Sequence, residues 1–291
     1  MSLHTSLRFV AVLITVLIAT QVKDVVWSSL LWSLAFVHYA LALFYSRRRM
    51  ALVTSQTHSL IPAVGVTLAG AALYLNQFSL LIYFGIHHVF NEVYLWNRTL
   101  SVPEDGGRRA LRGSAVLLNG FIYAVLLRHY SELSWIDPSL LFAGLLASYG
   151  YFFYCFNRLH PSLSLFTLIN SCSFELFGLL LVILSLFTPI GLNHIVLYHF
   201  IFWSLYPINK FYKQGHGELT RYLVVSLVLL GIFLLFSPMG VSDRAASEYY
   251  YYEQFLFWSF VHITLSFFLS DAHPAWITRW FRLRPKATPS S

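Results

Sequence analysis

The chain has 291 residues, of which 57% are hydrophobic and only 11% are charged. A soluble domain usually carries about 25% charged residues, so this composition excludes a soluble globular protein and predicts one integral membrane domain over residues 1–291. The net charge of +7 does not indicate nucleic-acid binding, because the basic residues lie in short loops beside apolar segments. The two cysteines both lie in apolar segments and exclude a disulfide framework.

Apolar segments separated by Pro, Gly and charged residues predict an all-α bundle of about ten transmembrane helices. The expected spans are residues 7–22, 25–45, 59–75, 77–97, 113–128, 139–157, 162–187, 192–210, 222–238 and 250–270. The first of them fits the hydrophobic part of a signal peptide. The residues that follow it make a poor cleavage site, so we expect a retained membrane span.

The distribution of basic residues predicts the orientation of the spans. With ten spans, all but three of the 19 Lys and Arg residues fall on the side that holds both termini. The three on the other side are Lys23, Arg128 and Arg244. Because cytoplasmic loops are enriched in Lys and Arg, both termini are expected in the cytoplasm, with the protein in a plasma or inner membrane.

Half of the twelve histidines lie inside predicted spans, all of them on even-numbered spans that run towards the cytoplasm. They are His38, His87, His88, His194, His199 and His262. Counted from the polar residue that ends each span, five of them lie at one depth, roughly 13–17 Å above the cytoplasmic boundary. His194 lies nearer the outer side.

A common depth on four helices predicts a shared partner or a shared cavity, because polar side chains in a bilayer are costly and face the protein interior. Neutral imidazole is the commonest metal ligand, and three or four of them suit Fe(II), Zn or Cu. The sequence therefore predicts a metal site made by His38, His88, His199 and His262, with Fe(II) favoured over Zn or Cu. A structural polar cluster, a haem site and a proton path are the alternatives.

The segment FGIHHVFNEVYLW, residues 84–96, holds four strongly polar side chains within a predicted span. His87 pairs with Asn91 and His88 with Glu92 at a spacing of four residues, on adjacent helix faces, so only one histidine is expected to reach the common centre. We favour His88, because Glu92 could accept a hydrogen bond from its other ring nitrogen; His87 is the alternative ligand. An interfacial Glu92 paired with an arginine is the alternative role for this acid.

Glu175, in NSCSFELFGLL, is a second acid inside a predicted span. It lies roughly 21 Å above the cytoplasmic end of that span, which Pro161 marks, and therefore somewhat above the histidines. It could be a metal ligand, a proton carrier or a carboxylic acid that stays protonated in lipid. Glu92 and Glu175 are the candidate catalytic residues.

Four short histidine motifs follow one another along the chain. They are FVHYALALFY at 36–45, GIHHVFNEVY at 85–94, VLYHFIFWSLY at 196–206 and FVHITLSFFLSD at 260–271. Their order and spacing resemble those of the Brp/Blh-type membrane β-carotene 15,15′-dioxygenases, in which histidine motifs on separate membrane helices bind a non-haem iron. The second motif is the most similar, with Glu92 four residues after His88. The other motifs differ from that family. The first has Ala42 in place of an acid, the third has Trp203 in place of a second histidine, and the fourth has Val261 in place of a proline.

The resemblance implies a histidine-ligated non-haem iron oxygenase that uses O2 on a lipophilic substrate in the lipid bilayer. It further implies oxidative cleavage of a carotenoid to retinal-type aldehydes. A haem-binding electron-transfer protein and another metal-dependent lipid-modifying enzyme are the alternatives. A membrane di-iron desaturase is not favoured, because the chain has no HxxxH motif. A transporter is not favoured either, because the sequence shows no inverted repeats.

Overall fold

A computed structural model describes residues 3–21, 24–54, 77–99, 105–128, 135–160, 164, 168–169, 171–187, 192–240 and 244–269. All regular secondary structure in these residues is helical, as the sequence predicts. The helices are α1 (Leu3–Gln21), α2 (Asp24–Thr54), α4 (Gln77–Thr99), α5 (Gly106–Leu126), α6 (Pro138–Leu159), α8 (Ser173–Leu184), α9 (Leu192–Leu205), α10 (Pro207–Gln214), α11 (His216–Phe236) and α12 (Arg244–Leu269). The expected span 59–75 lies outside the described residues.

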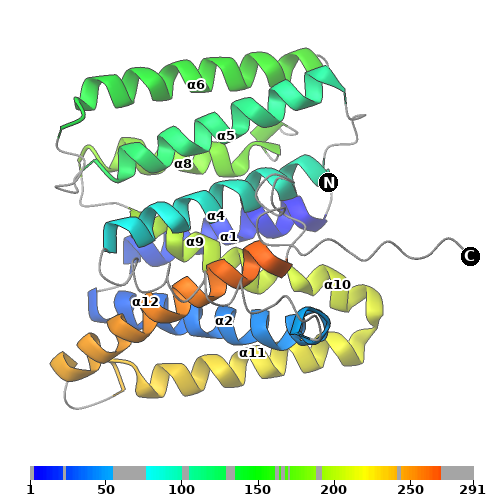
Figure 1. Cartoon of the computed structure of the whole chain (residues 1–291), viewed down its shortest axis with the longest axis vertical. Coiled ribbons are helices and arrows are strands. Elements are labelled where there is room, and N and C mark those ends of the chain that lie inside the picture. Colours follow the sequence, from blue (N-terminus) through cyan, green and yellow to red (C-terminus); the bar gives the residue numbers. More distant parts are fainter. Residues whose placement is uncertain are drawn as a thin grey trace, which may run out of the picture.

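The helices are stacked in successive layers (Figure 1). Helices α5, α6 and α8 form one end of the stack, α1, α4 and α9 lie in the middle, and α2, α11 and α12 form the other end. Helix α2 packs against α9, α11 and α12, and α12 also packs against α4. The histidines that the sequence predicts at a common depth are on α2, α4, α9 and α12, and these helices are therefore neighbours in the bundle.

Within the described residues, three helical segments are long and apolar enough to cross a membrane. They are Val26–Tyr45 in α2, Pro138–Leu159 in α6 and His216–Phe236 in α11. The third of these segments is only 6% buried inside the protein. A helix that is apolar on all sides and so little covered by protein is suited to contact lipid.

Helix α5 begins earlier than the sequence analysis expects. The segment PEDGGRR lies between the expected spans 77–97 and 113–128, but Gly106 is already helical and Asp105 caps the first turn. The Asp105 carboxylate accepts a hydrogen bond from the backbone N–H of Arg108 at 2.7 Å. Such a cap satisfies one of the N–H groups that the first turn of a helix leaves without a partner.

The expected span 192–210 is divided into two helices. Helix α9 ends at Leu205 and α10 begins at Pro207, which has no N–H with which to continue the hydrogen-bond ladder of α9. The turn from α10 into α11 uses Gly215, whose φ of 120° lies in a region that favours glycine. Helix α11 consequently begins at His216, before the expected span 222–238.

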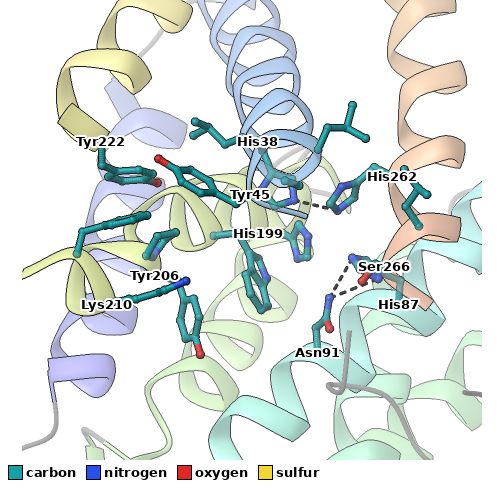
Figure 2. A pocket seen from close by; sticks show the side chains of 17 residues that line it. His38, Tyr45, His87, Asn91, His199, Tyr206, Lys210, Tyr222, His262 and Ser266 are labelled. Carbon is teal, nitrogen blue, oxygen red and sulfur yellow. Dashed lines mark hydrogen bonds between the residues drawn. The ribbon is translucent and has the colours of Figure 1, made fainter. Parts of the chain in front are cut away.

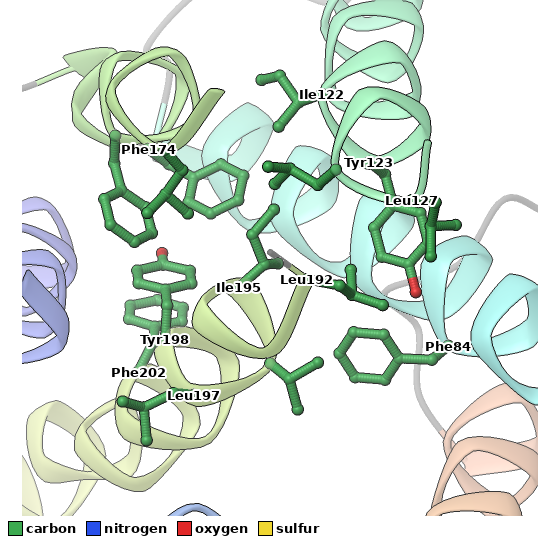
Figure 3. Packing of buried hydrophobic residues seen from close by; sticks show 14 of the residues in the cluster. Phe84, Ile122, Tyr123, Leu127, Phe174, Leu192, Ile195, Leu197, Tyr198 and Phe202 are labelled. Carbon is green, nitrogen blue, oxygen red and sulfur yellow. The ribbon is translucent and has the colours of Figure 1, made fainter. Parts of the chain in front are cut away.

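Packing around α9 fixes which of its faces meets each neighbouring helix (Figure 3). Tyr198 is fully buried, with its ring centroid 4.7 Å from that of Phe174 and 5.8 Å from that of Phe202. His199 is the next residue and points about 100° away around the helix. Aromatic packing on the Tyr198 side therefore holds His199 towards α2, α4 and α12.

Candidate metal centre

Histidines from four helices meet around His199. The Nε2 atoms of His38 on α2 and His262 on α12 lie 3.0 Å apart. The Nδ1 atom of His199 lies 3.1 Å from Nδ1 of His88 on α4. The centroid of the His199 ring is also 5.5 Å from that of His38 and 5.3 Å from that of His87. His199, which is 1% exposed, is therefore at the centre of the cluster.

His38, His199 and His262 each offer a ring nitrogen to one common position. These three nitrogens lie within 4.8 Å of one another. Two imidazole nitrogens that share a metal at about 2.0–2.1 Å lie roughly 3–3.5 Å apart, so the separation between His38 and His262 has the size that a shared ion requires. The three residues come from three different helices, and each is one of the histidines that the sequence predicts at a common depth.

The cluster forms one wall of a cavity of about 440 Å³ (Figure 2). His38, His87, His199 and His262 all line this cavity, together with Asn91. The amide nitrogen of Asn91 lies 3.0 Å from Nε2 of His87, which is the contact between residues four apart that the sequence predicts. His87, the alternative ligand of the sequence analysis, is therefore the α4 histidine on the cavity side.

His88 lies behind His199 and does not line the cavity. Its ring stacks on Phe84, with the centroids 5.7 Å apart, and its Nε2 has no hydrogen-bond partner among the described residues. His88, Glu92 and His199 form a second group whose ligand atoms lie within 4.8 Å of one another. His199 is thus shared between a group that opens to the cavity and a group that is closed.

Glu92 is engaged by Arg8 rather than by His88. Its Oε2 atom lies 2.7 Å from Nη2 of Arg8, which also donates to the Glu92 backbone oxygen at 3.1 Å. Tyr198 donates a further hydrogen bond to the same Oε2 at 3.2 Å. The carboxylate therefore joins α4 to α1 and α9. The buried guanidinium of Arg8 beside Glu92 would repel a cation bound by the group of His88, Glu92 and His199.

Glu175 and His194 lie away from the cavity. Glu175 on α8 is 2% exposed, its backbone oxygen accepts a hydrogen bond from the Tyr149 hydroxyl at 2.6 Å, and its Oε2 has no hydrogen-bond partner among the described residues. The ring of His194 lies 4.8 Å from that of Trp27. Neither residue lines the cavity, and of the candidate residues only His38, His87, His199 and His262 do so.

Sequence reasoning missed two groups of residues that the structure brings to the site. Arg8 was assigned to topology alone, although an arginine close to a long apolar run is a signal for a buried ion pair. Trp203 and Lys210 line the cavity and follow His199 along the chain. Trp203 and Lys210 come four and eleven residues after His199, a spacing that would place them on one face of a continuous helix. The helix is interrupted at Pro207, so the sequence alone does not show that Lys210 lies on the same side as His199.

The fold and the site define an all-helical protein with helices able to cross a membrane and a buried group of histidines able to hold a metal. No protein-family model, curated protein or solved structure matches the chain. The resemblance to the Brp/Blh dioxygenases therefore depends on the four histidine motifs alone.

Proposed function

We propose that this protein is a membrane metalloenzyme that holds Fe(II) with histidines and oxidises a lipophilic substrate with O2. The observation that carries the proposal is the group formed by His38, His199 and His262, whose nitrogens lie within 4.8 Å of one another at the wall of a 440 Å³ cavity. A group used only for structure would not need to open onto a space large enough for a ligand. Cavities that bind small molecules have volumes of about 300–1,000 Å³.

The donor set fits a non-haem iron. Three neutral imidazoles leave coordination positions open, which is the arrangement that oxygen-activating Fe(II) and catalytic Zn(II) both require. His38 and His262 would each supply Nε2, and His199 the nitrogen that faces them. His87, which lines the cavity, is the candidate for a fourth ligand. Bound there, Fe(II) would supply the activation of O2.

The surrounding residues position the ligands and exclude water. The contact with His88 occupies Nδ1 of His199, which fixes the His199 ring and leaves Nε2 for an ion. Leu41 and Leu265 give the cavity apolar walls close to the histidines. An apolar wall at that position favours a lipophilic substrate and keeps water away from the reacting atoms.

We further propose the ten-span arrangement with both termini in the cytoplasm, in a plasma or inner membrane. The distribution of Lys and Arg supports it, and the three apolar helices of the described residues are consistent with it. The Brp/Blh resemblance supports oxidative cleavage of a carotenoid as the reaction.

Oxygen consumption tests the proposed activity. Detergent-purified protein loaded anaerobically with Fe(II) should consume O2 when a polyene or another unsaturated lipid is added, and His262→Ala should abolish that consumption. A visible spectrum of the same protein should lack the intense Soret band of a haem. A Soret band would support the electron-transfer alternative instead.

A further inference from the structure

We propose that the cavity binds an anionic amphiphile, a long-chain carboxylate whose head lies at Lys210 and whose chain extends to the histidines. Only the oxidation of the amphiphile depends on the proposed function. Its binding does not require the metal.

The residues that line the cavity follow the same order along two helices. On α2 the order towards the cytoplasmic end is His38, Leu41 and Tyr45. On α9 and α10 the order is His199, then Trp203, then Lys210. Figure 2 shows the histidines together at one side of the cavity, with Tyr45 and Lys210 towards the other. The cavity therefore has a histidine end, an apolar middle and a polar, cationic end.

Among the described residues that line the cavity, Lys210 is the only one with a charged side chain, apart from histidine. None of these described lining residues is Asp or Glu, so none of them neutralises the ammonium group. The Lys210 Nζ lies 5.8 Å from the centroid of the Phe211 ring, and that ring stacks on Tyr222 at 4.9 Å. The Phe211 ring thus lies beside the ammonium group at this end of the cavity, and Lys210 is exposed. An incoming anion would supply the missing counter-charge.

Tyrosines complete the cationic end. The hydroxyl of Tyr222 donates to the backbone oxygen of Ser204, which fixes the ring in the wall. The Tyr45 ring lies 6.0 Å from the Tyr222 ring and 5.1 Å from the Phe211 ring, and Tyr45 is 41% exposed. A tyrosine hydroxyl at an exposed rim can donate to a carboxylate, and an aromatic rim is suited to the level of lipid headgroups.

The distance between the histidine end and the cationic end of the cavity fits an extended hydrocarbon chain rather than a compact polar molecule. From His38 to Tyr45 the rise along α2 is about 10 Å, and from His199 to Lys210 it is at most about 16 Å, because α9 gives way to α10 at Pro207. The wall between the ends is formed by groups such as Leu41, Ala42 and Trp203. An extended hydrocarbon chain would cover this apolar surface while its carboxylate remains at Lys210.

The histidine end offers polar groups to the reacting part of the chain. The Oδ1 atom of Asn91 and the indole Nε1 of Trp203 are buried and have no hydrogen-bond partner among the described residues. Asn91 is itself only 4% exposed. Buried polar atoms without partners are costly, so a ligand or the oxygen species that reacts with it is expected to satisfy them. A wholly neutral hydrocarbon, unlike a carboxylate, would also leave Lys210 without a counter-charge.

Fluorescence of a conjugated-polyene fatty acid tests the inference on metal-free protein in detergent. The matched variants are Lys210→Gln and Lys213→Gln, since Lys213 is on the same helix but does not line the cavity. A hydrogen bond to a charged group contributes about 1.5–3 kcal/mol, so Lys210→Gln should weaken carboxylate binding by about tenfold or more. Lys213→Gln should leave binding unchanged, and the alcohol of the same chain should bind both variants equally weakly.

Three outcomes would overturn the inference: no binding by the unmodified protein, equal affinity for the carboxylate and the alcohol, or equal effects of the two lysine variants. Binding of an alkyl phosphate but not of the carboxylate would also contradict it and would indicate a phospholipid head. Because the protein is metal-free, these outcomes leave the metal site untouched. Iron content, measured separately in Lys210→Gln, should equal that of the unmodified protein.

Discussion

The guanidinium of Arg8 lies 2.7 Å from the carboxylate of Glu92, which joins helices 84 residues apart in the sequence. Both side chains are buried, with Arg8 only 5% and Glu92 only 1% exposed. The rings of Phe174 and Phe202 lie 5.8 and 6.0 Å from the guanidinium carbon. Helix α1 therefore helps to hold α4, and with it the histidines of the site, through a pair of charges that water does not reach.

Removal of Arg8 alone should destabilise the protein strongly. Arg8→Met leaves the Glu92 carboxylate buried without its counter-charge, and breaking a buried ion pair in this way costs about 3–5 kcal/mol. The double variant Arg8→Met with Glu92→Leu removes both charges and should be clearly more stable than Arg8→Met. Denaturant unfolding in detergent measures both. A double variant as unstable as the single one would show that the charge pair is not the cause.

The role of His88 can be separated from that of a metal ligand. In the structure His88 contacts the Nδ1 atom of His199, which suits a residue that orients a ligand. Loss of such a contact typically costs about 10–100-fold in metal affinity, so His88→Ala should weaken iron binding that His38→Ala abolishes. An anaerobic Fe(II) titration measures both. If His88→Ala and His38→Ala bind equally little iron, His88 is itself a ligand, as the sequence predicts.

Close packing of α4 on α5 should make Gly85 intolerant of a side chain. A Cβ at Gly85 would lie 2.6 Å from Cε1 of Tyr123, whose hydroxyl donates to the backbone oxygen of Leu81 at 2.6 Å. Overpacking typically costs about 1–3 kcal/mol, so Gly85→Ala should lower the free energy of unfolding by that amount. Gly120→Ala is the control, because nothing lies within 4 Å of a Cβ there. Equal stability of the two variants would contradict the packing.

The proposed topology predicts where reporter fusions become accessible. Reporters fused after Arg112 and at the C-terminus should report the cytoplasm, because most of the Lys and Arg residues lie on that side. A reporter at Asp243, between the last two expected spans, should report the opposite side. A C-terminus outside the cytoplasm would contradict the ten-span arrangement and the common depth derived from it.

Depth along a helix can be counted from the sequence, whereas rotation about the helix axis cannot. His38, His199 and His262 were placed at one level by counting from charged residues at the span ends, and in the structure their ring nitrogens lie within 4.8 Å of one another. The choice between His87 and His88 depends on how α4 is rotated against α9 and α12. That rotation is set by contacts such as the one between Gly85 and Tyr123, which a single sequence does not reveal.

Other features depended on partners that are distant in the sequence. The sequence marks Arg8 as basic but does not say that Glu92 lies beside it, because α1 and α4 meet only after the bundle has formed. The division at Pro207 did have a local signal, but the apolar run continues across it and favoured one long span. The cavity has no local signal, since its wall combines residues of α2, α4, α9, α10, α11 and α12.

The metal content of the purified protein tests the central claim most directly. Elemental analysis after anaerobic Fe(II) loading and removal of unbound metal should find about one iron per chain, as expected for a single site with three imidazole ligands. His38→Ala and His262→Ala should lose that iron, while His194→Ala, whose ring lies against Trp27 outside the cavity, should keep it. Unmodified protein without iron, or His38→Ala and His262→Ala with the full content, would contradict the account.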